Sequence, residues 1–528
     1  MSSSNPNRQN EEDAFIDADE AEEVFTRDED HPMDSDEDGD GDGDGDQAMT
    51  IEEQEIEFQN DSTAHFDAHT DSIFCIAQHP IHNTIVITGS GDDSAYLFDS
   101  TPNTERPLLP TSYESDPQPR RERESLKPLV KMEGHSDSVN AVAFTEPRGE
   151  YVVTAGLDGR LRAWRDTTAN GDGTAWGFVA EVQEVEEINW VAVCPAGNGD
   201  EEKANVVALG GSDGSAWVFR VNYRDASEPV SIVQSFFQHT GPCTAGAWTP
   251  DGNLLATVSE DGSFYVFDVF GAAAAAGVSY SAGTSAVVGL TADDQRFAVE
   301  GGLYSVAIAP GGGFAAVGGA EGHIKIVGLP RLGTSGSAGP GSGAGASSKV
   351  KGRSAAQTSA ATAGTLLASL QPQSDSVETL SFSAPPLTLL ASGSVDGSIA
   401  LFDTAHRFAV RRHIREAHEG AVVKVEFLQS RSSAAPAVRP SPLAPATTAH
   451  RSYLLTSVGI DGVVRRWDAR GGTTAAGQGM LNEWKGHLGL TENDDGEQAG
   501  GIMGFVQGFD GKRVVTGGDD GISLVFEE

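Results

Sequence analysis

Two sets of side chains combine a histidine, a hydroxyl and an aspartate, as nucleophilic catalysis requires, and each set ends on a tryptophan: His135, Thr154, Asp158 and Trp164, and His418, Ser457, Asp461 and Trp467. In a hydrolase, the histidine takes the hydroxyl proton and the aspartate orients the histidine. Here the hydroxyl, the aspartate and the tryptophan recur at the same spacing in two distant segments. This repetition favours a structural role, in which buried polar groups satisfy one another.

The run "DSDEDGDGDGDGDQ", residues 34–47, contains eight acidic residues and resembles the start of a calcium-binding loop. An EF-hand loop needs oxygen ligands at positions 1, 3 and 5, glycine at position 6 and a glutamate at position 12. Counting from Asp34, Asp36, Asp38 or Asp40 places Gly, Gln, Met or Ile at position 12. The run therefore lacks the closing carboxylate, which favours a solvated acidic segment over a specific calcium site.

Other catalytic and cofactor patterns fail in the same way. "HIREAH", residues 413–418, does not have the histidine spacing of a zinc-protease helix. "GSGAGASSK" lacks the Gly-Lys-Ser/Thr step of a phosphate-binding loop. The three cysteines, Cys75, Cys194 and Cys243, each lie in or beside an apolar run, so we expect buried free thiols. We expect no catalytic residue, no bound metal and no cofactor.

A repeated β-hairpin must position the two polar sets. Residues 151–165, "YVVTAGLDGRLRAWR", read as strand, Asp-Gly turn and strand. Aligning the chain on this turn gives eight copies, with the turn carboxylate at Asp92, Asp158, Asp213, Asp261, Glu321, Asp396, Asp461 and Asp520. Six residues later each copy has a large apolar residue: Phe98, Trp164, Phe219, Phe267, Val327, Phe402, Trp467 and Phe526. The fifth copy is the most degenerate.

A further strand precedes each hairpin, as in "DSVNAVAFTEP", and several of these strands follow a histidine. This arrangement resembles the WD repeat and predicts an all-β propeller, with eight four-stranded blades across residues 61–528. The last hairpin, "ISLVFEE", would complete only three strands, so we expect the segment near 62–68 to close the ring as the fourth. Residues 1–60 carry 23 acidic and 2 basic side chains and should be a disordered tail.

Three low-complexity inserts interrupt the repeats, near residues 100–126, 333–364 and 430–451. They are rich in Gly, Ser, Ala, Pro and Thr, so we expect flexible surface loops. The sequence has no apolar run of 18 residues and no signal-peptide pattern, which predicts an intracellular protein without a membrane span.

The charge distribution predicts the partner. The net charge is −43, shared almost equally between the tail and the rest, so a direct nucleic-acid partner is disfavoured and a basic protein is favoured. In a propeller, the loops before each first strand and the Asp-Gly turns share one face. We expect that face to carry Asp71, Asp137, Glu186, Glu187, Glu260, Asp375, Glu419 and Asp519, with Glu492, Asp494, Asp495 and Glu497 nearby. We expect a monomer that binds a basic segment on this acidic face.

The acidic tail, the segment "DAHTDSIFCIAQHPIHNTIVITGSGDDSAYLFD", the third repeat's "EEINWVAVCP" and the seventh repeat's "LLTSVGIDGVVRRWDARGG" together resemble the family of angio-associated migratory cell protein. Its fungal relatives are chaperones dedicated to one large-subunit ribosomal protein. The resemblance implies a cytoplasmic ribosome biogenesis factor that holds the basic N-terminal segment of that newly made protein and escorts it to the 60S subunit. A general WD-repeat scaffold or a ubiquitin-ligase substrate adaptor is the alternative, and passage into the nucleus stays open.

Overall fold

The computed structural model describes residues 59–102, 124–168, 171, 173–197, 199–281, 285–332, 363–429, 451–471, 479–492 and 498–528. Residues 1–58 of the predicted disordered tail, with the calcium-like run, lie outside these residues, as does most of each predicted insert. The compact unit that contains the repeats extends from Phe58 to Glu528.

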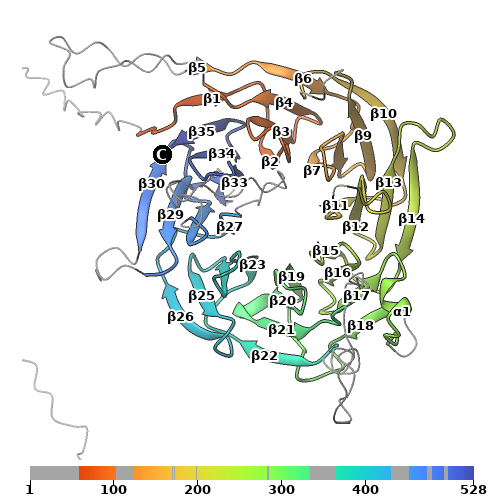
Figure 1. Ribbon diagram of the computed structural model, residues 1–528. Helices are drawn as coiled ribbons and strands as arrows, with labels where there is room; N and C mark the ends of the chain where they lie inside the picture. The colour runs from red at the N-terminus through yellow and green to blue at the C-terminus, as the bar shows by residue number, and fades with distance from the viewer. Residues whose placement is uncertain are drawn as a thin grey trace, which may run out of the picture. The chain divides into compact units, whose positions relative to one another are not determined.

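Eight four-stranded antiparallel sheets stand around a central axis and form a closed ring (Figure 1). The first four blades are β2 (Ile73–Gln78), β3 (Ile85–Ser90), β4 (Ala95–Asp99) and β6 (Pro128–Met132); β7 (Val139–Phe144), β8 (Tyr151–Gly156), β9 (Arg160–Asp166) and β10 (Trp176–Gln183); β11 (Ile188–Val193), β12 (Val206–Gly211), β13 (Ala216–Val221) and β14 (Val230–Phe236); and β15 (Cys243–Trp248), β16 (Leu254–Ser259), β17 (Phe264–Asp268) and β18 (Ala286–Leu290).

The other four blades are β19 (Leu303–Ile308), β20 (Phe314–Gly319), β21 (Ile324–Gly328) and β22 (Leu366–Leu370); β23 (Val377–Phe382), β24 (Leu389–Ser394), β25 (Ile399–Asp403) and β26 (Ala409–Ile414); β27 (Val422–Phe427), β28 (Leu454–Gly459), β29 (Val463–Asp468) and β30 (Met480–Lys485); and β33 (Ile502–Gln507), β34 (Arg513–Gly518), β35 (Ser523–Glu527) and β1 (Ala64–Phe66). The predicted eight-bladed propeller is confirmed, and the degenerate fifth repeat forms a complete blade.

The core lies between neighbouring blades. Every residue of the second strand is buried in blades 1, 2, 3, 4, 6 and 7. One apolar cluster, for example, joins Ile87 and Leu97 of blade 1 to Phe144, Val152 and Trp164 of blade 2. A sheet buried on both faces needs apolar side chains on both, which explains the continuous apolar runs of these strands. The eight large residues six positions after the turns are all buried.

The glycine of the Asp-Gly turn lies against the next blade. Gly159 has a φ of 73°, and a Cβ there would come within 2.1 Å of the Val185 carbonyl oxygen. Only glycine combines this left-handed backbone with so close an approach. The turn chemistry therefore sets the packing between blades as well as the hairpin.

Polar side chains also tie the innermost strands to one another. At seven of the eight junctions, a side chain of one innermost strand donates to a backbone carbonyl at the innermost strand of the next blade: Cys75 to Val139, Asn140 to Ile188, Asn189 to Cys243, Thr244 to Leu303, Ser305 to Val377, Thr379 to Val425 and Lys424 to Phe505. Among the described residues, blade 8 has no such bond to blade 1. The hydroxyl of Ser72 in blade 1 instead donates to the carbonyl of Asp519 in blade 8, at 3.0 Å.

The ring is closed by β1, the strand expected near residues 62–68. It pairs antiparallel with β35, with Ala64 opposite Val525, and Phe66 is fully buried against Phe98. Beyond β1, the short strand β5 (Glu124–Ser125) adds a parallel fifth strand, and the amide of Leu126 donates to the carbonyl of His65 at 2.8 Å. The end of the first insert, predicted to be flexible, is thus part of the closing sheet.

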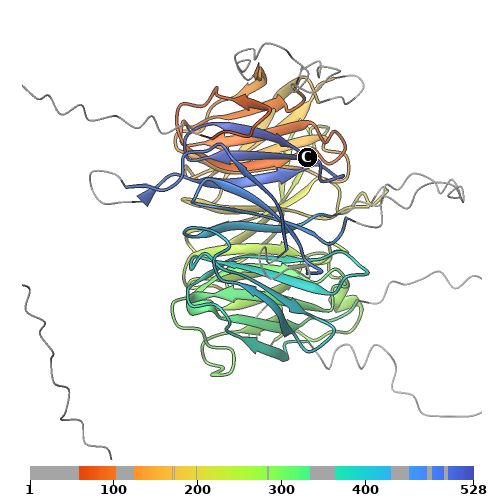
Figure 2. The same cartoon turned by 90° about the vertical axis from the view of Figure 1, so that its left-hand side faces the viewer.

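The strands run between two faces of the ring, seen from the side in Figure 2. We call the upper face the one formed by the loops that lead into each innermost strand and by the turns between second and third strands. The lower face carries the other connections. A small hairpin of β31 (Thr491–Glu492) and β32 (Gln498–Ala499) belongs to the loop before blade 8. Within the described residues, the helices are α1 (Ala272–Ala275) and a 3₁₀ turn at Ala320–Gly322. Among the described helices, none is long and apolar enough to cross a membrane.

Candidate protein-binding face

The two polar sets form buried hydrogen-bond networks within their blades. In blade 2, His135 Nδ1 lies 3.1 Å from Asp158 Oδ1, and His135 Nε2 lies 2.9 Å from Thr154 Oγ1. The indole N–H of Trp164 donates to the same hydroxyl oxygen at 3.3 Å. In blade 7 the equivalent distances, in an identical order of groups, are 2.9, 2.8 and 2.8 Å.

Burial fixes the protonation of the blade 7 network. It lowers the pKa of His418 against the opposing effect of Asp461, so the imidazole is neutral at pH 7. Burial alone would raise the pKa of Asp461, but hydrogen bonds and charges from His418 and Arg465 hold it at about 2. Arg465, whose Nη1 lies 2.8 Å from Asp461 Oδ2, is the permanent cation of this cluster. Nδ1 of the imidazole therefore donates to the carboxylate, and Nε2 accepts from the hydroxyl.

The hydroxyls of these networks are closed to solvent. Ser457 and Thr154 are both 0% exposed, so no substrate atom can reach them for attack. The network instead holds the backbone of the residue that follows the histidine. The turn aspartate accepts the backbone N–H of Ser136 in blade 2 and of Glu419 in blade 7, at 3.0 and 3.1 Å. The network thereby fastens the leading loop of the blade to its turn.

The other blades keep parts of this arrangement. His69, His239 and His487 each contact a threonine hydroxyl of the second strand at 2.7 to 2.9 Å. In blade 6, Gln373 replaces the histidine and accepts from the Ser392 hydroxyl at 2.6 Å. In blade 3 the position is the buried Val185. Gln373 was not among the predicted residues, because the sequence pattern rests on a histidine at this position.

A backbone hydrogen bond joins the turn to the leading loop in all eight blades. The donors are the amides of Gly91, Leu157, Ser212, Glu260, Ala320, Val395, Ile460 and Asp519, and the acceptors are the carbonyls of Ser72, Ser138, Glu187, Pro242, Gly302, Ser376, Ala421 and Gly501, at 2.9 to 3.2 Å. Because this bond repeats around the ring, every leading loop and every turn lies on the upper face.

The upper face consequently gathers all eight predicted acidic residues. Asp71, Asp137, Glu186, Glu187, Asp375 and Glu419 lie on leading loops, and Glu260 and Asp519 lie on turns. Seven of them are exposed. Asp519 is half-buried, and its Oδ2 accepts the amide of Gly500 at 2.7 Å. The four further acids named before blade 8 fall among side chains outside the described residues.

Three of the acidic residues have the same local geometry. In blades 1, 2 and 6 an Asp-Ser pair opens the innermost strand, and Oδ1 of Asp71, Asp137 and Asp375 accepts the amide of the following serine at 2.7 Å in each case. A carboxylate held by one oxygen keeps its second oxygen for a ligand. These residues are thus pre-oriented acceptors rather than freely moving surface charges.

The structure adds residues that the sequence patterns did not single out. Asp93 stands at the turn position that is glycine in other blades and has a φ of 60°. Its pKa is raised by burial and by the nearby charges of Asp137, Asp92 and Asp158, which places a dense acidic cluster between blades 1 and 2. The sequence carries a sign of this cluster, because the turn reads "GDDS", with Asp93 where the other turns have glycine.

An aromatic side chain lies among acids elsewhere on this face. Tyr304 of β19 has its pKa raised by burial and by the charges of Glu260 and Glu378, so it stands between two carboxylates of neighbouring blades. Its hydroxyl donates to the carbonyl of Gly301 at 2.6 Å. Phe74 of β2 is 39% exposed. Aromatic rings beside carboxylates suit the long aliphatic stems and charged ends of lysine and arginine.

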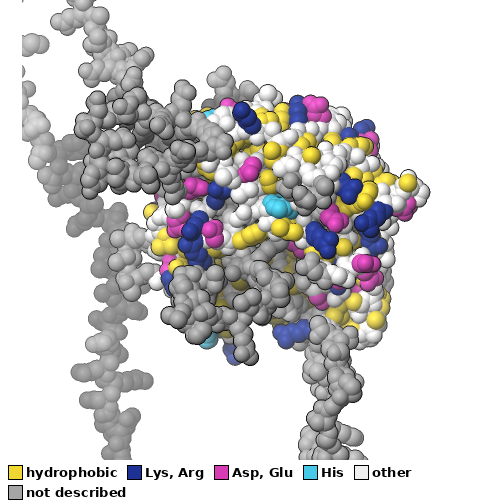
Figure 3. Space-filling view, turned by 45° about the horizontal axis from the view of Figure 1, so that its top comes forward, with side chains coloured by type: hydrophobic (Ala, Val, Ile, Leu, Met, Phe, Trp, Pro, Cys, Tyr) yellow, Lys and Arg dark blue, Asp and Glu magenta, His cyan; other side chains and the backbone are white. Residues whose placement is uncertain are grey.

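The outer side of the ring differs in charge pattern. Figure 3 shows Lys and Arg interspersed with Asp, Glu and apolar side chains on the side that it faces. Opposite charges pair between third and outermost strands, as in Arg162 with Glu181 and Arg465 with Glu483. Throughout the described residues, no group of three His, Cys, Asp or Glu side chains could hold a metal ion.

Comparisons with known proteins agree with this geometry. The model described as WD domain, G-beta repeat matches residues 60–99, 126–165, 230–268 and 364–403. The chain is 30% identical to the ribosome assembly protein Sqt1 of Saccharomyces cerevisiae over 221 residues, which span 43% of that protein. It is 25% identical to human angio-associated migratory cell protein over 89% of this chain and 81% of the human one.

The crystal structure of Chaetomium thermophilum Sqt1 bound to the N-terminus of ribosomal protein L10 is 47% identical, with a TM-score of 0.70. It covers 89% of this chain and 100% of that chain. With this identity over the whole solved relative, the chain belongs to the WD-repeat family that contains Sqt1 and angio-associated migratory cell protein.

Proposed function

We propose that this protein is a ribosome biogenesis factor whose upper face binds the basic N-terminal segment of newly made ribosomal protein L10 and escorts that protein to the 60S subunit. The observation that carries the proposal is the relative at 47% identity, solved with the N-terminus of L10 bound to it. The upper face of this chain supports it, because eight acidic side chains gather there around one ring.

The physical reason is charge. A free ribosomal protein is cationic and aggregates with nucleic acid, so an acidic partner shields it until assembly. Carboxylates held in place, as at Asp137 and Asp375, offer charge-assisted hydrogen bonds to Lys and Arg at little ordering cost. The net charge of −43 adds long-range attraction and speeds encounter.

The protein acts by binding and not by catalysis in this proposal, because the His, hydroxyl and Asp sets are buried and hold loops in place. Its place of action is the cytoplasm, where ribosomal proteins are made. Imaging of the tagged protein at native expression tests the location, and an exclusively nuclear signal would contradict it.

Affinity capture followed by mass spectrometry tests the function. We expect one ribosomal protein, L10, at about equal stoichiometry, and a purified complex with the synthetic L10 N-terminal segment that weakens as salt rises. Cullin-ligase subunits without a ribosomal protein would instead support the substrate-adaptor alternative. A complex of unchanged affinity at high salt would contradict the acidic-face model.

A further inference from the structure

The upper face carries apolar side chains as well as carboxylates, and they gather at the junction between blades 7 and 8. Leu488 and Leu490 belong to the leading loop of blade 8 and are 52% and 38% exposed. Ile460 is half-buried in the turn of blade 7. We call these three residues the apolar patch. Its members come from neighbouring blades, so it exists only in the folded ring.

The backbone holds the apolar patch in place. A Cβ on Gly420, in the leading loop of blade 7, would lie 2.8 Å from Ile460 Cγ1 and 3.1 Å from Leu490 Cδ1. Gly420 has a φ of 103°, so this glycine provides both the backbone shape and the room for the two side chains. The loop that carries Leu488 is closed, because the amide of Gly501 donates to the Leu488 carbonyl at 2.9 Å.

Leucine at position 488 departs from the pattern of the other blades. The residue that follows the network histidine or glutamine is polar in the other five blades that have one: Thr70, Ser136, Thr240, Ser374 and Glu419. In all six blades its amide donates to the turn aspartate, at 2.6 to 3.4 Å. This backbone role needs no apolar side chain. Contiguous apolar side chains left in water therefore point to an interaction site.

Carboxylates border the apolar patch. Glu419 is exposed and directly precedes Gly420, which contacts the patch. On the other side, Asp519 Oδ2 accepts the amide of Gly500, at the end of the loop that carries both leucines. A ligand across the junction of blades 7 and 8 would thus meet apolar surface and negative charge together. This combination fits a polypeptide segment in which an apolar side chain stands among Lys and Arg.

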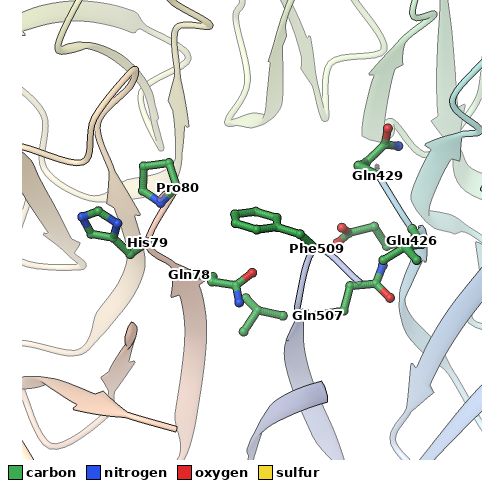
Figure 4. Close-up of a pocket in the computed structure, with 9 residues that line it drawn as sticks. Gln78, His79, Pro80, Glu426, Gln429, Gln507 and Phe509 are labelled. Atoms are coloured by element: carbon green, nitrogen blue, oxygen red, sulfur yellow. The ribbon is translucent and has the colours of Figure 1, made fainter. Parts of the chain in front are cut away.

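The same blades hold a cavity of about 300 Å³ at the lower face, beside the ends of β27 and β33. Figure 4 shows Glu426 and Gln507 on one side of it. Both side chains are already bonded within the fold, since Glu426 pairs with Lys424 and the amide oxygen of Gln507 accepts the hydroxyl of Thr456. The apolar patch, in contrast, presents exposed side chains that a ligand can reach.

We infer that the apolar patch selects the client, by taking up an apolar side chain that stands among basic residues in the client's N-terminal segment. The inference rests on the proposed function, because it assumes a basic segment on the upper face. Charge alone attracts any cationic protein and discriminates poorly between them. An apolar contact at one place in the ring restricts tight binding to segments whose apolar side chain lies at the matching distance from their Lys and Arg residues.

The test replaces both leucines in the whole chain, as Leu488→Ser with Leu490→Ser, and uses isothermal titration calorimetry. About half of each side chain is available for burial, so the dissociation constant of the synthetic L10 N-terminal segment should rise about 10- to 100-fold. Salt screens charges and not apolar contacts, so this ratio should be the same at 50 and 500 mM salt.

The matched control is Ile81→Ser with Leu367→Ser. It removes side chains that are 54% and 48% exposed, one on the lower face and one on an outermost strand, and it should bind the L10 segment as the wild type does. Leu488→Ser alone removes the more exposed leucine. It should keep the thermal melt of the wild type and still weaken binding.

Two host peptides separate this inference from the identity of the client. They are acetyl-Gly-Arg-Arg-Leu-Arg-Arg-Gly-amide and the same peptide with Ser in place of Leu. The wild type should bind the Leu peptide about fivefold more tightly, and the double variant should bind the two peptides equally. A Leu preference that persists in the double variant would place the apolar contact elsewhere and overturn the inference.

Unchanged affinity of the double variant, or of Leu488→Ser alone, for the L10 segment would overturn the inference and leave the proposed function in place. A loss of affinity that disappears at 500 mM salt would also overturn it, because the leucines would then act through the charges. A wild type that ignores the L10 segment but shows the Leu preference, with the preference lost in the double variant, would support the apolar patch and contradict the proposed client. Absence of both would overturn both.

Discussion

Neutralising three upper-face carboxylates should weaken binding of the L10 segment without unfolding the protein. The variant is Asp137→Asn, Glu260→Gln and Asp375→Asn. Asparagine keeps an oxygen that can accept the amide of the following serine, as Asp137 and Asp375 do at 2.7 Å, so the leading loops retain their shape. Only charge is removed, from three separate blades.

The magnitude follows from exposure. All three side chains are exposed, where each ion pair contributes about 0.2–1 kcal/mol. Because the three residues stand in different blades, their effects should add, giving about 0.6–3 kcal/mol. The dissociation constant should therefore rise about 3- to 150-fold at low salt.

Isothermal titration calorimetry at 50 and 500 mM salt measures the effect, with thermal melts of each protein beside it. The matched control is Glu201→Gln, Glu202→Gln and Glu228→Gln, which removes the same charge from exposed positions on lower-face loops of blade 3. The control should change affinity less than threefold, since screening cuts off charges more than about 10 Å away. Equal losses in the two variants would refute the upper face as the binding site, and so would a triple variant that binds as tightly as the wild type.

Three further predictions concern stability. Phe66→Ala should lower the free energy of unfolding by about 3–5 kcal/mol in urea titrations, because the ring is fully buried and stacked 4.3 Å from Phe98 in the closing sheet; a loss under 1 kcal/mol would mean that β1 does not hold the ring shut. Gly159→Ala should destabilise the fold by more than about 2 kcal/mol, because its φ is 73° and the new Cβ would approach the Val185 carbonyl oxygen, whereas Gly197→Ala, with open space around it, should be nearly neutral in the same titration. Burial lowers the pKa of His239 to about 4 from an ordinary 6.5. As the pH drops, the unfolded state therefore takes up this proton before the folded state does, and the free energy of unfolding should fall between about pH 6.5 and pH 4, by roughly 3 kcal/mol from this residue. His239→Gln should flatten that part of the pH-stability curve, and an unaltered curve would contradict the assignment.

The repeating part of the fold could be predicted from the sequence because its physical requirements recur. A turn residue at positive φ, a carboxylate after the second strand and a large apolar residue six positions later recur in every blade, and the turn residue is glycine in all blades but the first. Those requirements leave a similar pattern of letters eight times, as at Asp158 and Trp164 or at Asp461 and Trp467. The face that carries the acidic residues followed from the same alignment, because a leading loop and its turn are bonded in every blade.

What could not be predicted depends on contacts between distant segments. Asp93 departs from glycine in the sequence, but the charges of Asp137 and Asp158 come near it only when blade 2 packs beside blade 1. The pairing of β5 with β1 joins residues about sixty positions apart through two residues and one buried leucine, too short a pattern to recognise. Gln507 looks like any strand-end glutamine until the Thr456 hydroxyl of another blade donates to its oxygen and its nitrogen is left buried, with no acceptor among the described residues.

The pairing of β1 with β35 means that the ring can close only near the end of synthesis. Ala64 leaves the ribosome early, but its partner Val525 is made about 460 residues later, some 25–90 s at ordinary translation rates. During that interval β1 has no partner strand, and the loop of blade 1 at Asp71 lacks its hydrogen-bonded neighbour in blade 8. The upper face is therefore incomplete on a nascent chain, and under the proposed function we expect it to bind its client fully only after the last strand has been released.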